Sequence, residues 1–492
     1  MMGRPSRSVL LERMNRMLDE LRKDIASGRL QTGQYIPSEV ALGKQFGISK
    51  ESVRQALDKL VEEGLIRKIR RVGNQVVGKA AGTAERAITD TDLREGAGDG
   101  TTDGVRKEMF SIPRAASVTR NVLKLAYYPV LEHEAILIPL IQAFEQRYSG
   151  VKIELLPTPL PVDYAEHGMA DVFTVSIWDH MKLLEKDPSL RIMSEPPTGL
   201  SCYPKLNDIF QSADGRLSAA PFIFSPVLLC YNQDHLDACG IEEPNENWTW
   251  YTLQKHARTL SRELGVQGFA SHVQSLNRWP VFLLQNGFRF NEQLPDRIAD
   301  SPDLWESLRI SRDLIHGQDK IRPLLSENDA DIEHWFREGK VSMIMTTYFG
   351  MNSLLDSPIS YAAAPLPSLR NNDTLLLVTG LSCSSSSPVP ELSRALIEFL
   401  CGEEAQRLIR RHTLSLPACP AAYTVQDGLM GNRPSQDLTP EQILEQGQFY
   451  SRLNIKPRII EDMRDQLKGF WSSIEDEIEA GERLEQLLKS HS

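Results

Sequence analysis

The chain of 492 residues is 41% hydrophobic and 25% charged, and it contains no run approaching the ~18 consecutive apolar residues that a membrane-spanning helix needs. Its net charge of −11 is uneven, because residues 1–79 hold 16 basic and 9 acidic side chains while the remainder carries a net charge of −18. A basic N-terminal part on an acidic body indicates nucleic-acid binding by the N-terminal part alone.

Two features of the sequence bear on the compartment of the protein. After a basic start, residues 10–16 are interrupted by charged side chains and so lack the apolar core of a secretory signal peptide. The six cysteines lie far apart, with no Cys-x-x-Cys pair and no His at metal-binding spacing, which favours reduced, buried thiols over a disulfide or a zinc site. We therefore expect a cytoplasmic protein without a bound metal.

The N-terminal part shows the periodicity of three helices followed by a hairpin. Apolar side chains recur every three or four residues along 10–25 and again along 49–60, which predicts two amphipathic helices. Between them, residues 38–46 predict a short helix and Gly47 predicts a tight turn, so the second and third helices form a helix-turn-helix. Two β-like runs within 65–77 predict a hairpin with a basic tip.

A helix-turn-helix followed by such a hairpin, or wing, is an arrangement that binds DNA. A helix fits the major groove and presents donors and acceptors to base edges, while flanking Lys and Arg side chains neutralise phosphates. Arg54 and Gln55 have the chemistry to contact base edges. The candidate DNA-binding residues are Ser38, Lys50, Ser52, Arg54, Gln55, Arg67, Lys68, Arg70, Arg71, Gly73 and Asn74. A solvated charged face is the alternative, but the coincidence of basic residues with this motif favours DNA.

The same region resembles a known family of regulators. The runs Phe46-Gly47-Ile48-Ser49 and Ser52-Val53-Arg54-Gln55-Ala56-Leu57 are typical of the DNA-binding domain of the GntR family, which residues 8–79 resemble almost continuously. The resemblance implies a winged helix-turn-helix of the α+β class, a homodimer and a double-stranded DNA operator. This chain has Val40 where the family usually has Arg, and Arg71-Val72 where a Gly and a basic residue are usual, so the family's usual operator sequence does not carry over.

The segment that follows has a different composition. Residues 80–118 are poor in large apolar groups and rich in Gly, Thr, Asp and Ala, so they cannot bury enough surface to offset the entropy of ordering. We predict a flexible linker between a DNA-binding domain, 1–79, and a larger domain, 119–492.

Strands and helices are predicted to alternate from residue 119 onward. Apolar runs at 122–127, 151–155 and 171–175 predict strands, and the stripe along 135–148 predicts a helix between the first two. This order predicts right-handed βαβ units and a mainly parallel sheet. Ligands bind beyond the carboxyl ends of such strands.

Many short motifs of this larger domain resemble those of bacterial extracellular solute-binding proteins of the maltose-binding-protein type. They occur in order between residues 121 and 420, and include Ala170-Asp171-Val172-Phe173, Ala220-Pro221-Phe222, Trp279-Pro280 and Ala364-Pro365-Leu366-Pro367. The resemblance implies a two-lobed α/β fold like that of periplasmic binding proteins of type II, with a ligand cleft between the lobes. It also implies hinges near 221–226, 345–350 and 380–387.

The ligands of that family are usually sugars, whose faces stack on aromatic rings and whose hydroxyls bind polar side chains. Carried over by position, the candidate ligand-binding residues are Tyr128, Glu132, His133, Trp178, Asp179, Phe222, Trp279, Tyr348, Phe349 and Gly380. Trp248 and Trp250 are predicted to pack in the core instead. His133 beside Glu132 is interpreted as a hydrogen-bonding histidine rather than as one partner of an acid–base pair.

These observations together predict a ligand-responsive transcription regulator that senses a carbohydrate or related small molecule and controls a transport or catabolism operon. One alternative is a regulator whose body has lost ligand binding and serves only for dimerisation. An enzyme acting on sugars is the other alternative, but no cofactor-lysine pattern, Gly-x-Ser-x-Gly, Walker or His-Glu-x-x-His motif is present. No cofactor and no membrane partner are expected.

Overall fold

The computed structural model describes residues 7–26, 30, 36–37, 42, 46, 50–62, 65–69, 73–77, 122–291, 298, 301–316, 326–424 and 428–491. The chain divides into two compact units, residues 1–116 and 117–492. The predicted linker and the candidate residues Ser38, Arg70 and Arg71 lie outside the described residues.

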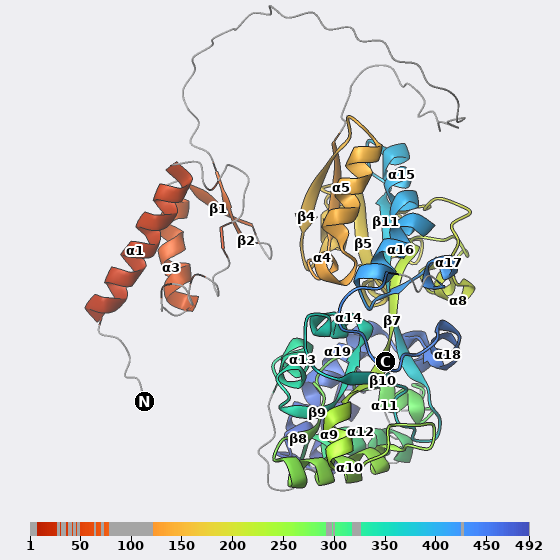
Figure 1. The fold of residues 1–492 in the computed structure, drawn as a ribbon. Helices are drawn as coiled ribbons and strands as arrows, with labels where there is room; N and C mark the ends of the chain where they lie inside the picture. Colours follow the sequence, from red (N-terminus) through yellow and green to blue (C-terminus); the bar gives the residue numbers. More distant parts are fainter. Residues whose placement is uncertain are drawn as a thin grey trace, which may run out of the picture. The chain divides into compact units, whose positions relative to one another are not determined.

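The N-terminal unit contains two described helices and a β-hairpin (Figure 1). Its elements are α1 (Arg7–Ala26), α3 (Lys50–Glu62), β1 (Ile66–Ile69) and β2 (Gly73–Val76). The two strands pair antiparallel, with Ile66 opposite Val76. The predicted apolar stripes meet in one core, which also buries Leu42 and Phe46 of the intervening segment. These are the elements of the predicted winged helix-turn-helix.

The first lobe of the body, lobe 1, is built on three parallel strands. They are β3 (Val122–Tyr127), β4 (Lys152–Pro157) and β5 (Val172–Ser176), and β3 lies between the other two. The helices of this lobe are α4 (Leu131–Glu134), α5 (Leu137–Arg147), α6 (Pro161–Glu166), α7 (Ile177–Lys186), α15 (Pro390–Cys401) and α16 (Glu403–His412). The predicted alternation of strands and helices is confirmed, and pairing within this lobe is parallel. The prediction of a mainly parallel sheet for the body is wrong, because the long strands at residues 220–232 and 374–384 pair antiparallel with each other and with their outer neighbours.

The second lobe, lobe 2, has its own strands and its own core. Here β8 (Gln267–Ala270) pairs parallel with β9 (Val341–Thr347), while β10 (Tyr361–Ala364) pairs antiparallel with the last residues of β7. The helices around them are α9 (Gln233–Ala238), α10 (Trp250–Leu264), α11 (Pro280–Gln285), α12 (Pro302–His316), α13 (Asp329–Arg337), α19 (Pro457–Gln466), α20 (Lys468–Trp471) and α21 (Glu477–His491). Trp248 and Trp250 are buried in this core, as predicted.

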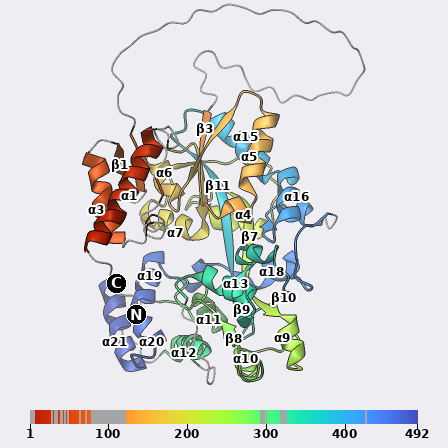
Figure 2. The ribbon, with the colours of Figure 1, turned by 60° about the vertical axis from the view of Figure 1, so that its left-hand side comes forward.

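Two long strands connect the lobes, and both are visible between them in Figures 1 and 2. The first, β7 (Ala220–Asn232), is buried along its whole length, as its nearly unbroken apolar sequence predicts. Its first half pairs with β11 (Thr374–Ser384) and its second half pairs with β9. The other edge of β11 pairs with β5, so the sheet order is β4-β3-β5-β11-β7-β9-β8.

The segments expected to act as hinges have clear positions in this fold. Residues 221–226 lie in the half of β7 that pairs with β11, and 380–387 lie at the end of β11 and in the turn after it. Residues 345–350 include the end of β9 and most of α14 (Tyr348–Met351). Hinge motion at these positions stays a prediction.

Short elements complete the body. They are β6 (Met193–Ser194), α8 (Pro204–Asn207), η1 (Asp208–Phe210), η4 (Asn352–Leu354), β12 (Leu416–Pro417), α17 (Pro420–Tyr423), α18 (Pro440–Gln446), β13 (Gly447–Gln448) and η5 (Tyr450–Leu453). No helix among the described residues has both the length and the apolar character to span a bilayer.

Candidate functional site

The N-terminal unit places a polar helix face beside a hairpin. On α3, Val53, Leu57 and Leu60 are buried, whereas Arg54 is exposed on the other side of the helix. The hairpin pairs Arg67 with Gln75 and Lys68 with Asn74, on a framework tied to α3 by the backbone bond from Leu65 N to Leu60 O (3.0 Å). Side chains of six of the other candidates lie outside the described part of the structure: Lys50, Ser52, Gln55, Arg67, Lys68 and Asn74.

In lobe 1, the predicted positions Tyr128 and Asp179 come together with Ser176 at the carboxyl ends of β3 and β5. The Tyr128 hydroxyl donates to Asp179 Oδ2 and accepts a bond from the backbone N–H of Ser176 (3.1 Å). Ser176 also caps α7, because its hydroxyl accepts from the Asp179 N–H (3.1 Å). Burial, followed by the negative charge of Asp179, raises the pKa of Tyr128 above its usual range. We call Tyr128, Ser176 and Asp179 the lobe-1 polar cluster.

Glu132 and His133 behave differently from each other. The Tyr127 hydroxyl donates to Glu132 Oε1 (2.7 Å), and burial together with this bond raises the pKa of Tyr127. His133 is exposed on α4, and no hydrogen bond between Glu132 and His133 occurs in the described structure. Nothing in this geometry favours an acid–base pair.

Four other candidate positions are packed inside the protein. Phe222, Trp279 and Tyr348 are fully buried in the structure, so a ligand could reach their rings only if the core opened. They had been expected to face the cleft, but each occupies an element whose inward face is core. At Gly380 in β11, an added Cβ would lie 2.9 Å from the Phe210 ring, so close packing alone explains glycine there. Phe349 is half-buried and packs against the core of lobe 1.

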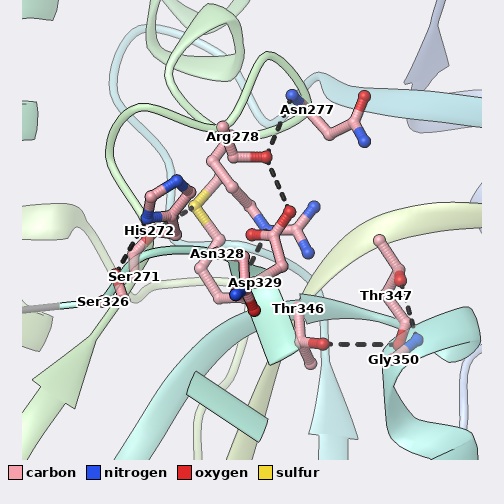
Figure 3. A network of polar contacts seen from close by, with 12 residues as sticks. Ser271, His272, Asn277, Arg278, Ser326, Asn328, Asp329, Thr346, Thr347 and Gly350 are labelled. Carbon is pink, nitrogen blue, oxygen red and sulfur yellow. Dashed lines mark hydrogen bonds and ion pairs between the residues drawn. The ribbon is translucent and has the colours of Figure 1, made fainter. Parts of the chain in front are cut away.

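A second group of polar side chains lies in lobe 2, at the carboxyl ends of β8 and β9 (Figure 3). Arg278 is only 3% exposed; its Nε lies 3.4 Å from Asp329 Oδ1 and donates to the Met345 carbonyl (3.1 Å). The Ser275 hydroxyl donates to Asp329 Oδ2 (2.8 Å). Ser275, Arg278 and Asp329 are the lobe-2 polar cluster. Its position matches that of the lobe-1 polar cluster, and it is where open α/β sheets bind ligands.

The lobe-2 polar cluster is not saturated. Arg278 Nη1 is buried and finds no hydrogen-bond partner among the described residues. A buried donor without a partner costs about 1–3 kcal/mol and so calls for an explanation; a site that binds an acceptor group is one such explanation.

Aromatic and amide side chains connect the two clusters. The Trp178 ring of α7 lies 4.8 Å from the Tyr450 ring of η5, at an interplanar angle of 64°. The Tyr450 hydroxyl bonds Asn277 Oδ1 (2.7 Å) and the Leu276 carbonyl (3.1 Å), next to Arg278. A continuous set of contacts thus leads from the start of α7 in lobe 1 to the loop that holds Arg278 in lobe 2.

Two carboxylates from opposite lobes also influence each other. Burial, followed by the charge of Glu333 in α13, raises the pKa of Glu134 in α4 to about 7. Glu333 is itself buried and accepts a bond from the Thr346 hydroxyl (2.6 Å), and its burial raises its pKa as well. At neutral pH these carboxyl groups therefore hold a proton more readily than exposed ones do.

Sequence reasoning missed most of the residues contributed by lobe 2. Arg278 directly precedes the recognised Trp279-Pro280 motif, so its place beside that motif was the one usable signal in the sequence. Tyr450 lies beyond residue 420, where the recognised resemblance ends, and no local pattern distinguishes it. Among the described residues, no group of three or more His, Cys, Asp or Glu side chains could hold a metal ion.

The fold and these clusters define a DNA-binding domain joined to a two-lobed binding-protein fold. Residues 14–76 match the family described as "Bacterial regulatory proteins, gntR family". The chain is 43% identical over 58 residues to the mannosyl-D-glycerate transport/metabolism system repressor MngR of Escherichia coli K12, a match that covers 12% of this chain and 24% of MngR. It is 25% identical over 181 residues to the HTH-type transcriptional repressor NagR of Bacillus subtilis 168, covering 36% of this chain and 70% of NagR.

The body is similar to solved solute-binding proteins. Maltose-bound MalE3 of T. maritima superimposes with a TM-score of 0.63 at 17% identity, over 75% of this chain and 100% of MalE3. The substrate-binding protein Lmo0181 of Listeria monocytogenes, in complex with cycloalternan, superimposes with a TM-score of 0.58 at 19% identity, over 75% of this chain and 98% of Lmo0181. The chain therefore combines a gntR-type helix-turn-helix domain with a body of the two-lobed periplasmic-binding-protein fold.

Proposed function

We propose that the protein is a ligand-responsive transcription regulator whose N-terminal domain binds an operator and whose body binds a small molecule between its lobes. One observation carries the proposal: a gntR-type helix-turn-helix domain precedes a solute-binding fold in a single chain. A DNA target implies that the protein acts in the cytoplasm. The domain limits 1–79, 80–118 and 119–492 form part of the proposal.

The DNA-binding side rests on charge and geometry. Arg54 is exposed on α3, and the Arg67 and Lys68 backbone belongs to the hairpin beside it. We propose that α3 lies in the major groove, that Arg54 and Gln55 read base edges, and that the hairpin residues contact phosphates. A two-fold operator calls for a homodimer, because each helix-turn-helix reads one half-site.

The ligand side rests on the two polar clusters. Tyr128, Asp179 and Arg278 carry hydroxyl, carboxylate and guanidinium groups beyond strand ends of the two lobes, a set suited to the hydroxyls of a carbohydrate. Arg278 is buried in this arrangement, so we propose that it meets a ligand when the lobes move apart. MalE3 was solved with maltose and Lmo0181 with cycloalternan, and MngR is named for the transport and metabolism of mannosyl-D-glycerate. We therefore propose a carbohydrate or related effector, and a transport or catabolism operon as the target.

Ligand and DNA binding are proposed to be coupled through closure of the lobes. Closure by hinge motion moves one lobe relative to the other and changes the pairing of two DNA-binding domains in a dimer. A coupling of ~1–3 kcal/mol between the sites changes DNA affinity about 5- to 150-fold.

The test uses the full chain and an operator selected from a random DNA library. DNA affinity is titrated by fluorescence anisotropy with and without each member of a panel of mono- and oligosaccharides. At least one sugar is expected to change the affinity about 5- to 150-fold. Binding of DNA as a dimer with no response to any sugar, and no sugar-induced change in tryptophan emission, would favour a body that only dimerises. Cleavage of a chromogenic glycoside would favour an enzyme.

A further inference from the structure

One lobe-1 side chain makes its hydrogen bond and its closest aromatic contact with lobe-2 groups. Trp178 is the second residue of α7, a helix that begins where β5 ends. Its ring packs against the core of lobe 2 together with Met181, and it meets Tyr450 edge-on at 4.8 Å. Trp178 was predicted to stack on a sugar, yet its ring already has protein neighbours.

A single carboxylate holds both this indole and the next turn of α7. Glu461 in α19 accepts a hydrogen bond from Trp178 Nε1 (3.0 Å) and forms an ion pair with Lys182 Nζ (2.5 Å). Lys182 lies one turn after Trp178, with its ammonium 6.0 Å from the indole ring. Glu461 therefore contacts two residues of lobe 1 that are about 280 positions away in the sequence.

We infer that Glu461 is a positioning residue that fixes Trp178 and Lys182 against α19 and so stabilises the arrangement of the two lobes seen in this structure. The inference goes beyond the proposed function and does not depend on the identity of any ligand. Other groups of α7 make their bonds within lobe 1: Asp179 to Tyr128, and His180 to Ser218. The polar link from α7 to α19 in the described structure is Glu461.

The two bonds of Glu461 differ in strength. The Lys182 and Glu461 side chains are 43% and 30% exposed, so solvent and salt screen their ion pair. The Trp178 bond is a charge-assisted hydrogen bond to a half-buried indole, which is the stronger kind of contact. Loss of the indole bond should therefore destabilise the contact between α7 and α19 more than loss of the lysine pair does.

The same helix supplies a matched control. Lys186, one turn after Lys182, forms an ion pair with Glu166 of α6 (2.6 Å), and their side chains are 65% and 21% exposed. This pair has similar chemistry and exposure, but both partners belong to lobe 1. Glu166→Ala therefore removes an ion pair from α7 without removing a contact between the lobes.

The experiment is hydrogen–deuterium exchange of the full chain, read on peptides from α7 and α19 and, as a reference, from α10 in lobe 2. Glu461→Ala is expected to speed exchange in both α7 and α19 roughly tenfold, because it removes both bonds. Glu461→Gln keeps an acceptor for the indole and loses the lysine pair, so we expect a change of about threefold or less, equal to that of Lys182→Met. High salt should raise the exchange rates of the wild type to those of Glu461→Gln, because salt screens the lysine pair.

Specific outcomes decide the matter. Glu166→Ala should leave α19 at its wild-type rate, and α10 should be unchanged in every variant, which separates lobe opening from general destabilisation. The inference is overturned if Glu461→Ala leaves α19 unchanged, or if Glu166→Ala speeds α19 as much as Glu461→Ala does. Because no sugar or DNA enters this experiment, its failure is distinct from failure of the proposed function.

Discussion

Arg278 is a buried charge whose ion-pair partner in the described structure is Asp329, with Glu333 also close enough for their charges to interact. Asp329 is 33% exposed and lies 3.4 Å from Arg278, so the pair is not fully desolvated. Removing one partner of a fully buried pair costs about 3–5 kcal/mol, and the partial exposure of Asp329 lowers the expected cost. We expect Asp329→Ala to lower the free energy of unfolding of the body by about 2–3 kcal/mol. Urea denaturation followed by tryptophan emission measures this, because all seven Trp lie beyond residue 177.

The control for that substitution is the pair of Arg312 and Asp313, in which the mutated aspartate is 51% exposed. Asp313→Ala should change the stability by less than about 1 kcal/mol, as is usual for exposed pairs. Equal losses for Asp329→Ala and Asp313→Ala would show that Arg278 does not depend on Asp329.

His180 gives the body a defined sensitivity to acid. It is fully buried, its Nε2 lies 2.8 Å from the Ser218 hydroxyl, and burial lowers its pKa to about 4. An unfolded histidine takes up its proton near pH 6.5, so the folded state is favoured above that pH and loses stability as the pH falls from about 6.5 to about 4.

His180→Gln is expected to flatten this pH dependence while also lowering stability through imperfect packing. The exposed His133 provides the comparison, since His133→Gln should preserve the slope. Denaturation midpoints at closely spaced pH values between 4 and 7 test the expectation, and an unchanged slope in His180→Gln contradicts it.

At the scale of elements, β8 and α10 approach so closely that only glycine fits at one position. A Cβ on Gly268 would overlap the Ala257 carbonyl oxygen of α10, a backbone atom that cannot swing away. Gly268→Ala should therefore destabilise the body by about 2–3 kcal/mol through overpacking.

Gly265, a second glycine of the same region, allows the cost of a packing clash to be compared with the cost of backbone strain. Gly265 ends α10 with φ +71, and a Cβ there meets no atom within 4 Å. Gly265→Ala should cost only about 1 kcal/mol, the strain of a left-handed residue. Thermal unfolding of the two variants gives the comparison; a smaller loss for Gly268→Ala than for Gly265→Ala would refute the packing argument.

How well the sequence predicted these elements depended on how local their signals are. The stripe of Val53, Leu57 and Leu60 and the strands after residue 119 follow from periodicity, and the structure has them. Trp279 and Tyr348 were misjudged because position in a motif says nothing about which way a ring points. Burial is decided by distant partners such as Trp471, 5.7 Å from Trp279.

The candidate site was the harder part for the same reason. Tyr128 and Asp179 were found because both follow strands that the sequence identifies. The partners that complete the site come from segments far along the chain: Asp329 from the start of α13, Tyr450 from η5 and Glu461 from α19. Their proximity is a product of topology, which one sequence does not encode in any local pattern.

At the scale of the whole molecule, opposite charges are divided between the two units. The excess of basic residues in 1–79 should make duplex binding strongly salt-dependent, with affinity falling about 10³- to 10⁵-fold between 50 and 200 mM salt if 6–10 phosphates are contacted. Arg54→Ala should cost about 1–3 kcal/mol on a selected operator and less on random duplex. Fluorescence anisotropy measures both, with residues 117–492 alone as the control that should not bind.

The carboxyl groups of Glu134 and Glu333 should link the arrangement of the lobes to pH. A pKa near 7 for Glu134 means that its proton is favoured while the lobes are together, compared with about 4.5 when it is solvated. The arrangement of the lobes seen in this structure is thus favoured at low pH and loses that contribution as the pH rises from about 4.5 through about 7. The pKa of Glu333 also depends on its neighbours, because the charge of Arg278 lowers it and the charge of Asp329 raises it.

Exchange in α13 and α4, corrected for intrinsic pH effects, should be slower at pH 5.5 than at pH 8 in the wild type. Glu134→Gln should remove the difference and resemble the wild type at low pH. Persistence of the full difference in Glu134→Gln would assign it to another group.

The strand β7 has one further consequence, for how this body can be divided. A fragment that ends at Asn232 would contain β7 without β9 and β10, the partners of its second half. A fragment that begins after Asn232 would contain β9 without β7, the strand with which it pairs. Neither fragment is therefore expected to fold alone. Two fragments made together should instead recover each other, as halves of a split reporter do.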